Sequence, residues 1–479
     1  MNVEKLKPGE SAVLTDSCTW YPVSPAALPL GKYRAQARFV ADRQHSDWDS
    51  CPGSLFSPEV TFEILADTKE VLVDLVLSQS PRVSPEINVG RVEFVQTRSD
   101  LLSKFYGHDV KLNAGVVLPI DYDPKRTYPA VYHVAGFGGD HRGALRHANI
   151  STSAAPDSDS GKLARNAFEI FLDAESPNGH TLFVDSDNNG PRGASLVNEL
   201  IVELEKRYPL AKTPAARVLR GHSSGGWSVL WLATEYPEVF GACWSSSPDS
   251  VDFRRFQLTD IYDDTNLYFA EDSAAARYQS PAALMPAIGG APQELSSYRK
   301  LVRAKDVPVT MVPTMSAMRE NLQEEVQGVA NTSAQQWDSW QAAFGPRNSD
   351  GKPAALFDPR SGVIDPIIAR SYRKFDIADR LRKEPGKFAP IFVQRVRLCV
   401  GELDNFFLNE AVALLKSDVE KVPVSDSQSP QGRQGYIKII PGHDHGSIFA
   451  TPEIRGIPSE MLTHFARHGL TPADQNAPR

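Results

Sequence analysis

The chain has 479 residues, a net charge of −8, and 41% hydrophobic and 23% charged residues. This length exceeds what one hydrophobic core normally serves, so we expect two or three domains. The net charge is negative and the sequence contains no cluster of basic residues, which argues against nucleic acid or an anionic membrane as a partner. No uninterrupted apolar run is long enough to cross a bilayer, so we expect no membrane span.

The first ten residues lack the apolar core of a signal peptide. This predicts a cytoplasmic protein, or a periplasmic or secreted one if a leader was removed. The four cysteines have no metal-ligand spacing, and we expect neither a metal nor a cofactor. Cys18 and Cys51 could pair in an exported protein, whereas Cys243 and Cys399 lie in apolar runs typical of buried free thiols.

Residues 1–88 are predicted to form a small Ig-like β-sandwich domain. Apolar and polar residues alternate over Gly31–Val40, and Val60–Ile64 and Val71–Val76 have the composition of further strands. Turn-forming Pro and Gly residues lie between these segments. The loop from Trp48 through Asp49 to Gly53 is either a binding surface or, as we favour, a loop that packs on the sandwich.

Residues 89–479 are predicted to form an α/β domain with a mostly parallel sheet. The predicted strands are Val92–Val95, Val110–Leu118, Thr181–Asp185, Ala216–Arg220, Phe240–Ser245, Val396–Val400 and Tyr436–Ile440, together with a strand within Tyr128–Gly139 that runs into a glycine-rich loop. Gly193–Arg207 and Ser459–His468 have helical apolar spacing, and the polar stretch Ser151–Lys162 predicts a surface loop. Strands that alternate with helices indicate βαβ units and therefore a parallel sheet.

The alternation of predicted strands and helices stops between residues 251 and 390. This stretch contains helical pieces and Pro/Gly-rich joints. We interpret it as an insertion that forms a lid over the edge of the sheet where ligand sites form. Its aromatic residues permit an aromatic ligand, but we favour a small core of the insertion itself; they are Tyr262, Tyr268, Trp337, Trp340 and Phe344.

Residues 221–225 read Gly-His-Ser-Ser-Gly and match G-x-S-x-G, the nucleophile elbow. The pattern alone is weak, but a predicted strand precedes it and an apolar helical face containing Trp227 follows it. Such a turn places a serine, here Ser223, at a crowded corner where its neighbours must be small. The amide of Ser224 then lies at a helix N-terminus, where N–H groups stabilise negative charge.

The strand that begins at Tyr128 runs into the glycine-rich segment Gly136–Gly139. In an α/β-hydrolase, the loop at this position supplies the second N–H of the oxyanion hole. The main chain of Phe137 is our candidate donor.

A serine hydroxyl needs a histidine base, which in turn needs a carboxylate to orient it. In α/β-hydrolases the order along the chain is serine, acid, histidine, with the last two on loops after later strands. Here the loop after Val400 offers Glu402 and Asp404, and the loop after Ile440 offers His443 and His445. Asp404 has an alternative role as a helix N-cap, in which case Glu402 is the acid.

These segments resemble the putative esterase family of α/β-hydrolases. Its members include feruloyl and acetyl-xylan esterases, enterochelin esterases, S-formylglutathione hydrolases and mycolyltransferases. The resemblance rests on the Tyr128–Gly139 strand and loop, the Asn-Asn-Gly-Pro motif at 188–191, the elbow, Gly401-x-x-Asp404 and Gly442-His-Asp444. Enterochelin esterases also carry an N-terminal β-sandwich.

The family's G-x-x-D and G-H-D loops imply Asp404 as the acid and His443 as the base. Three features depart from the family. Ala135 stands where the oxyanion loop commonly has His, His445 stands where an aromatic residue often follows G-H-D, and the insertion is long. These departures affect the prediction of the substrate more than the prediction of the reaction type.

The sequence therefore predicts a metal-free carboxylic ester hydrolase that acts through an acyl-enzyme on a small-molecule or carbohydrate-linked ester. Ser223, Asp404 and His443 would form the triad, with Glu402 and His445 as the alternative acid and base. Acyl transfer to an alcohol, and an inactive module that binds carbohydrate or a partner, are the alternative functions. Four residues are candidates to line the substrate pocket: Arg142, Asn188, Asn189 and Trp227.

Overall fold

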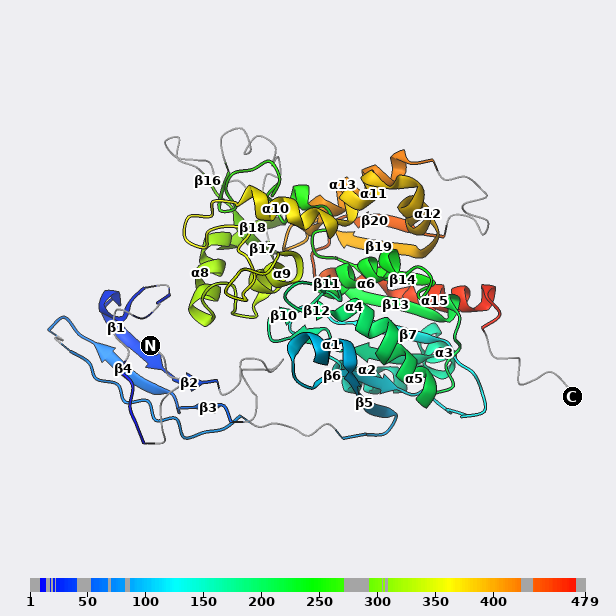
Figure 1. The fold of residues 1–479 in the computed structure, drawn as a ribbon, viewed down its shortest axis with the longest axis horizontal. Helices are drawn as coiled ribbons and strands as arrows, with labels where there is room; N and C mark the ends of the chain where they lie inside the picture. The colour runs from blue at the N-terminus through cyan, green and yellow to red at the C-terminus, as the bar shows by residue number, and fades with distance from the viewer. Residues whose placement is uncertain are drawn as a thin grey trace, which may run out of the picture.

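The computed structural model describes residues 9–13, 18, 20–21, 23–40, 53–67, 70–81, 87–270, 293–303, 305, 309–423 and 434–470. An eight-stranded sheet with the order β5-β6-β8-β7-β13-β14-β19-β20 runs through the large domain (Figure 1). Its strands are β5 (Val92–Ser99), β6 (Val110–Val117), β7 (Ala130–Val134), β8 (Phe168–Leu172), β13 (Arg217–His222), β14 (Ala242–Ser246), β19 (Val396–Gly401) and β20 (Tyr436–Ile440).

All neighbouring strands from β8 to β20 pair in parallel, whereas β6 pairs antiparallel with both β5 and β8. The strands β7, β14 and β19 are buried along their whole length, and β13 is buried at Val218, Leu219 and Gly221, as expected for a sheet that is covered on both faces. Their carboxyl ends meet at one edge, which is where α/β folds place ligands. The predicted α/β-hydrolase sheet is confirmed.

Helices cover both faces of this sheet. One face is packed by α1 (Asp100–Tyr106), α5 (Ile201–Arg207), α6 (Ser224–Glu235), α12 (Pro385–Arg395) and α13 (Leu408–Lys421), and the other by α2 (Gly143–Thr152), α3 (Asp159–Asn166) and α15 (Ile457–Arg467). The predicted helix over residues 193–207 is confirmed as α4 (Arg192–Ser195), a π-helical turn η3 (Leu196–Leu200) and α5. Side chains on opposite sides of a strand therefore enter different cores.

Three predicted elements were wrong. The polar stretch Ser151–Lys162 is not one surface loop, because it contains the end of α2 and the start of α3, which is capped by the hydroxyl of Ser158. Thr181–Val184 is a buried turn in which Leu182 and Phe183 both have positive φ, and Asp185 begins the short strand β11 (Asp185–Ser186), which pairs with β12 (Gly190–Pro191) outside the large sheet. Val71–Val76 lies outside every strand of the structure.

The described part of the N-terminal region forms two antiparallel ribbons to one side of the large sheet (Figure 1). One pairs β1 (Gly31–Ala35) with β4 (Val60–Ile64), and the other pairs β2 (Arg38–Phe39) with β3 (Leu55–Phe56). No apolar side chain is buried within the described residues of 1–88. A small β-region is therefore present, and its closure into a sandwich domain stays a prediction.

Two of the sequence predictions fall wholly or partly outside the described residues. Trp48, Asp49 and Ser50 of the candidate binding loop lie there, as does Cys51. Its proposed partner Cys18 is a free cysteine in the structure. Cys243 and Cys399 are buried free cysteines, as predicted.

The 251–390 insertion lies above the sheet, beside the carboxyl ends of its strands (Figure 1). It contains a hairpin of β17 (Ser296–Val302) and β18 (Thr310–Ser316), followed by α8 (Ala317–Gln327), α9 (Gln336–Phe344), α10 (Pro366–Ser371) and α11 (Ile377–Lys383). Four of its five named aromatic residues are buried in the main core, namely Tyr268, Trp337, Trp340 and Phe344. Tyr262 packs against this core and donates a hydrogen bond to Asp376. We had favoured a small core of the insertion itself, and this was wrong in one respect: the rings are part of the main core, where Phe344 packs against Trp227.

Candidate active site

Ser223 stands at the junction of β13 and α6 with φ 58° and ψ −128°. A non-glycine residue rarely adopts this backbone conformation, and such strain of about 1–3 kcal/mol persists only where the surroundings enforce it. The amide of Ser223 donates to the carbonyl of Ser246, which fixes the turn against β14. A Cβ atom at Gly225 would lie 2.1 Å from the carbonyl oxygen of Val134, so only glycine fits there. The strained turn predicted from the motif is present.

Ser224 opens helix α6 and is held through its side chain. Its hydroxyl donates to Asp249 over 2.7 Å, and Trp340 of the insertion donates its indole N–H to the same carboxylate oxygen over 2.9 Å. The amide of Gln336 reaches the Ser224 hydroxyl at 3.4 Å. Asp249 and the insertion thereby hold Ser224 in place. The main-chain N–H of Ser224 lies at the start of α6, beside Ser223.

Asp404 and His445 form a hydrogen-bonded pair. Nδ1 of His445 lies 2.8 Å from Oδ2 of Asp404, and the carboxylate is fully buried. The other carboxylate oxygen accepts the main-chain N–H of Phe406 over 2.9 Å. The main-chain N–H of His445 donates to Oδ1 of Asn405, so the two loops are joined by backbone as well as side-chain contacts.

The structure gives His443 and Glu402 other partners. Nδ1 of His443 lies 3.2 Å from the carbonyl oxygen of Ser447, within its own loop. Glu402 is exposed and accepts the main-chain N–H of Gly442 over 3.0 Å. The carboxylate contact expected for His443 is thus made by His445, and Glu402 braces the turn of the histidine loop.

The imidazole of His445 lies close to the elbow. Its ring centroid is 4.5 Å from that of His222, the residue immediately before Ser223. Nδ1 of His222 contacts the hydroxyl of Ser246 at 3.2 Å. Burial, with the nearby His445 as a smaller cause, lowers the pKa of His222 to about 3. His222 is therefore neutral near pH 7 and packs beside the Asp404–His445 pair.

Burial and charge act in opposite directions on His445. Burial lowers its pKa, but the negative charge of Asp404 and the hydrogen bond to it raise the pKa, and the net result lies above the ordinary histidine value. Asp249 also contributes a negative charge. Burial raises the pKa of Asp249 itself to about 6, although the bonds from Ser224 and Trp340 oppose this. The site thus surrounds one histidine with two buried carboxyl groups.

The glycine-rich loop after β7 passes next to Ser223. A Cβ atom placed on Gly136 would lie 3.1 Å from the Cβ of Ser223, which shows how closely the backbones approach. The Nε2 atom of His180 contacts the carbonyl oxygen of Ala135 at 3.0 Å, which anchors the start of the loop. Phe137 follows with an exposed side chain, 36% accessible, so its position owes nothing to side-chain burial.

Three of the four candidate pocket residues are used in packing. Trp227 is fully buried and donates to the carbonyl of Ser250 over 3.1 Å. Asn188 donates to main-chain carbonyls of Ala342 and Gly345 in the insertion. Asn189 is buried and accepts hydrogen bonds from Ser176 and Asn178. The fourth residue, Arg142, is half-exposed and paired with Asp140. A role for any of them in binding substrate stays a prediction.

The insertion also holds the loop that carries Asp404. Arg299 of β17 donates its Nε to the main-chain oxygen of Asp404 over 3.0 Å. Arg299 and Asn405 exchange two further bonds, one from each residue to the other's carbonyl. Sequence reasoning missed Arg299, Asn405, Asp249 and Gln336. Asp249 could have been identified from the sequence, because it follows the carboxyl end of a predicted strand. The contacts of the other three residues depend on how the insertion folds.

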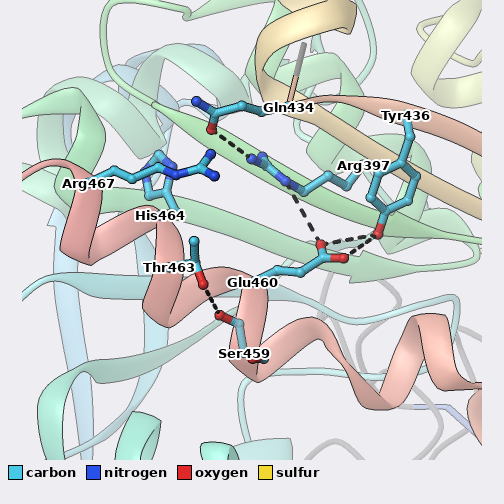
Figure 2. A pocket seen from close by; sticks show the side chains of 8 residues that line it. All are labelled: Arg397, Gln434, Tyr436, Ser459, Glu460, Thr463, His464 and Arg467. Carbon is cyan, nitrogen blue, oxygen red and sulfur yellow. Dashed lines mark hydrogen bonds and ion pairs between the residues drawn. The ribbon is translucent and has the colours of Figure 1, made fainter. Parts of the chain in front are cut away.

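A pocket of about 330 Å³ lies away from this site, between β19, β20 and α15 (Figure 2). Several of its polar groups pair with one another: Tyr436 donates to Glu460, and Arg397 reaches both Glu460 and Gln434. Trp244 also donates to Glu460, over 2.7 Å. Because these groups satisfy one another, we interpret the pocket as a structural cluster on the far side of the domain.

Comparison with known proteins assigns the family. The model of the family described as "Putative esterase" matches residues 106–351, more than half of the chain. The chain belongs to the putative esterase family. The match includes the elbow and ends before the Asp404 and His445 loops. This esterase is therefore a hydrolase of carboxylic esters.

Similar solved structures include a ferulic acid esterase, at 11% identity and a TM-score of 0.43, with 78% of this esterase and 99% of that chain covered. An S-formylglutathione hydrolase from Agrobacterium tumefaciens has 10% identity and a TM-score of 0.39, covering 79% and 97%. A ferulic acid esterase from Anaeromyces mucronatus, in complex with ferulic acid, has 12% identity and a TM-score of 0.32, covering 79% and 93%. No curated protein sequence matches this esterase. Among its described helices, none combines the length and apolarity that a bilayer crossing requires.

Proposed function

We propose that this esterase is a serine hydrolase in which Ser223 is the nucleophile, His445 the general base and Asp404 the residue that orients the base. The observation that carries this proposal is the 2.8 Å bond between Asp404 and His445, formed where the His445 ring packs beside the elbow. His443 was the base implied by the family's G-H-D loop. We now favour His445, because a base needs a carboxylate partner and, among the described residues, the ring of His443 has a carbonyl oxygen as its hydrogen-bonding partner.

In the proposed reaction, the Ser223 hydroxyl attacks the ester carbonyl carbon while Nε2 of His445 takes its proton. The Nδ1–H of His445 points at Asp404, which fixes the tautomer and stabilises the imidazolium that forms. His445 then returns the proton to the leaving alcohol. A water molecule, deprotonated by the same imidazole, hydrolyses the acyl-enzyme and regenerates Ser223.

The main-chain N–H groups of Ser224 and Phe137 are the proposed donors to the oxyanion. Ser224 lies at the N-terminus of α6, where amides have no partner inside the helix, and the Gly136 backbone brings Phe137 alongside Ser223. Each such donor is typically worth about 3–4 kcal/mol in the transition state. Asp249 supports this arrangement through the Ser224 side chain rather than through contact with substrate.

The test is a Ser223→Ala variant assayed with p-nitrophenyl acetate and labelled with a fluorophosphonate probe. Hydrolysis and labelling should both be lost, because each requires the serine oxygen. Ser153→Ala, at an exposed position at the end of α2, is the matched control and should behave as wild type. Turnover or labelling that survives in Ser223→Ala rules out Ser223 as the nucleophile. A wild-type protein that is never labelled favours an inactive module instead.

A further inference from the structure

A second group of chemically active side chains lies on the opposite side of β13 from helix α6. It consists of His133 on β7, His147 on α2 and Glu169 on β8. One ligand atom from each residue can be chosen so that the three atoms all lie within 4.8 Å of one another. The three residues come from separate elements and are 14 to 36 positions apart in sequence. No spacing motif could therefore have revealed them.

Both imidazoles converge on one oxygen. Nε2 of His133 lies 2.5 Å and Nε2 of His147 lies 3.1 Å from Oε2 of Glu169. Glu169 and His133 are buried, with side chains 6% and 11% accessible. The buried Nε2 of His147 makes no hydrogen bond within the described part of the chain, despite its distance from Glu169. A buried ring nitrogen that lies 3.1 Å from a carboxylate oxygen without a hydrogen bond needs an explanation.

Phe171 holds the two rings in place. It stacks on His133 with ring centroids 4.3 Å apart and an interplanar angle of 3°, and it contacts His147 at 5.2 Å. The Phe171 ring and the contacts with Glu169 thus place both imidazoles beside one carboxylate oxygen.

We propose that His133, His147 and Glu169 bind a divalent transition-metal ion, for which Zn²⁺ is the best fit. Two imidazole nitrogens and one carboxylate oxygen are a known zinc ligand set that leaves a fourth position for water or another ligand. Zinc bonds of about 2.0–2.2 Å place neighbouring ligand atoms roughly 3.3 Å apart, so the observed separations need only small side-chain movements. Hard ions such as Mg²⁺ prefer all-oxygen sites and are disfavoured here.

A pocket of about 360 Å³ reaches one member of the cluster. His133, Phe171 and Arg220 line it, together with Gly139 and Asp140 of the loop after β7. Arg220 carries a positive charge that interacts with Glu169, as does Arg91. These positive charges weaken the binding of a bare metal ion. They favour an anionic fourth ligand on the bound ion, such as hydroxide or a carboxylate. A bound ion would join β7, β8 and α2 directly below the loop that contains Phe137.

The experiment uses the full chain without a histidine tag, stripped by a chelator and titrated with ZnCl₂ alone by calorimetry. The same samples are analysed for bound metal after dialysis, and CoCl₂ is used to record the visible absorption of the site. His147→Ala is the main variant, because this half-exposed residue on α2 can be removed with little effect on the core. Glu169→Gln tests the carboxylate, and His108→Ala, an exposed histidine elsewhere, is the control.

We expect one equivalent of Zn²⁺ in wild type and in His108→Ala. Affinity should fall by at least about 100-fold in His147→Ala and Glu169→Gln, because even changes to residues behind metal ligands cost 10–100-fold. Zn²⁺ should also raise the Tm of wild type but not of His147→Ala, since a ligand that binds only the folded state stabilises it. Ser223→Ala should bind zinc like wild type, which separates this proposal from the triad. Wild type that binds no zinc, or His147→Ala that binds it equally well, overturns the proposal.

Discussion

The imidazole of His445 is hydrogen-bonded to Asp404, whereas His443, two residues earlier on the same loop, faces the carbonyl of Ser447. The two histidines share a loop and differ in what they contact. A carbonyl oxygen orients a histidine through a dipole, whereas a carboxylate adds a full negative charge and therefore stabilises the protonated form more strongly. The first prediction follows from this difference.

Replacing His445 by Ala should lower kcat for p-nitrophenyl acetate by at least about 1,000-fold, since a general base and its role in activating the nucleophile are both lost. His443→Ala is the matched control and should stay within about threefold of wild type, a change of under 1 kcal/mol in the barrier. Steady-state kinetics on the two purified variants decides between them. If His443→Ala is the inactive variant, the family's G-H-D assignment was right and ours is wrong.

Asp404→Asn should lower the plateau of kcat/KM by about 10³–10⁴-fold, because the neutral amide no longer stabilises the imidazolium. The reaction needs neutral His445, so kcat/KM rises with pH through the pKa of this group. That pKa is now raised by the charge of Asp404 against the effect of burial. The amide removes the charge, so the acid limb of the pH profile should move to lower pH.

Glu402→Gln is the control for this experiment, since Glu402 is exposed and bonds only the turn at Gly442. It should leave both the plateau and the acid limb unchanged. A Glu402→Gln enzyme with the loss expected of Asp404→Asn would identify Glu402 as the acid.

Asp249→Asn should change how stability depends on pH. Burial raises the pKa of Asp249 to about 6 in the folded state, against about 3.9 in an unfolded chain. The folded state therefore holds its proton more tightly, and wild type loses stability as pH rises from 4 through 6. Linkage puts this loss on the order of 2 kcal/mol between pH 4 and pH 8.

The Asn variant keeps an oxygen that can accept from both Ser224 and Trp340 and lacks the titration. Its stability relative to wild type should thus improve as pH rises. Urea unfolding of both proteins at pH 4, 6 and 8 measures this. Parallel curves for the two proteins across these pH values would show that Asp249 keeps an ordinary pKa.

Gly225→Ala should destabilise the protein by more than about 3 kcal/mol, because overpacking alone costs 1–3 kcal/mol and here the new methyl group meets rigid backbone. A Cβ at this position lies 2.1 Å from the oxygen of Val134 and 2.5 Å from that of Ala135. Gly386→Ala is the control, since a Cβ there meets nothing within 4 Å. Thermal unfolding should show a large drop in Tm for the first variant and little change for the second.

Much of the sheet could be predicted from sequence because its strands are short apolar runs with clear ends. Tyr436–Ile440 was predicted at its observed bounds, and most of the other strands within a few residues. Phe168–Leu172 was missed, because its central position in the sheet depends on pairing with β6 and β7, far away in sequence. Thr181–Asp185 has a strand-like composition, but packing holds Leu182 and Phe183 at positive φ.

The site was predictable where local geometry defines it and less so elsewhere. The elbow around Ser223 is a local motif, and its glycine pattern together with the strand before it and the helix after it is enough to predict it. Choosing between His443 and His445 requires the direction of each side chain in a loop, which a motif does not contain. The contacts from Trp340 and Arg299 arise from an insertion whose fold the sequence did not reveal.

The backbone of Ser223 has a consequence for how this esterase tolerates change. At φ 58° and ψ −128° any side chain is strained, and glycine is the residue that relieves this. Ser223→Gly should therefore yield a protein that melts at a higher temperature than Ser223→Ala. The strained backbone at this position thus lowers stability for any residue with a Cβ, including the serine that the proposed reaction requires.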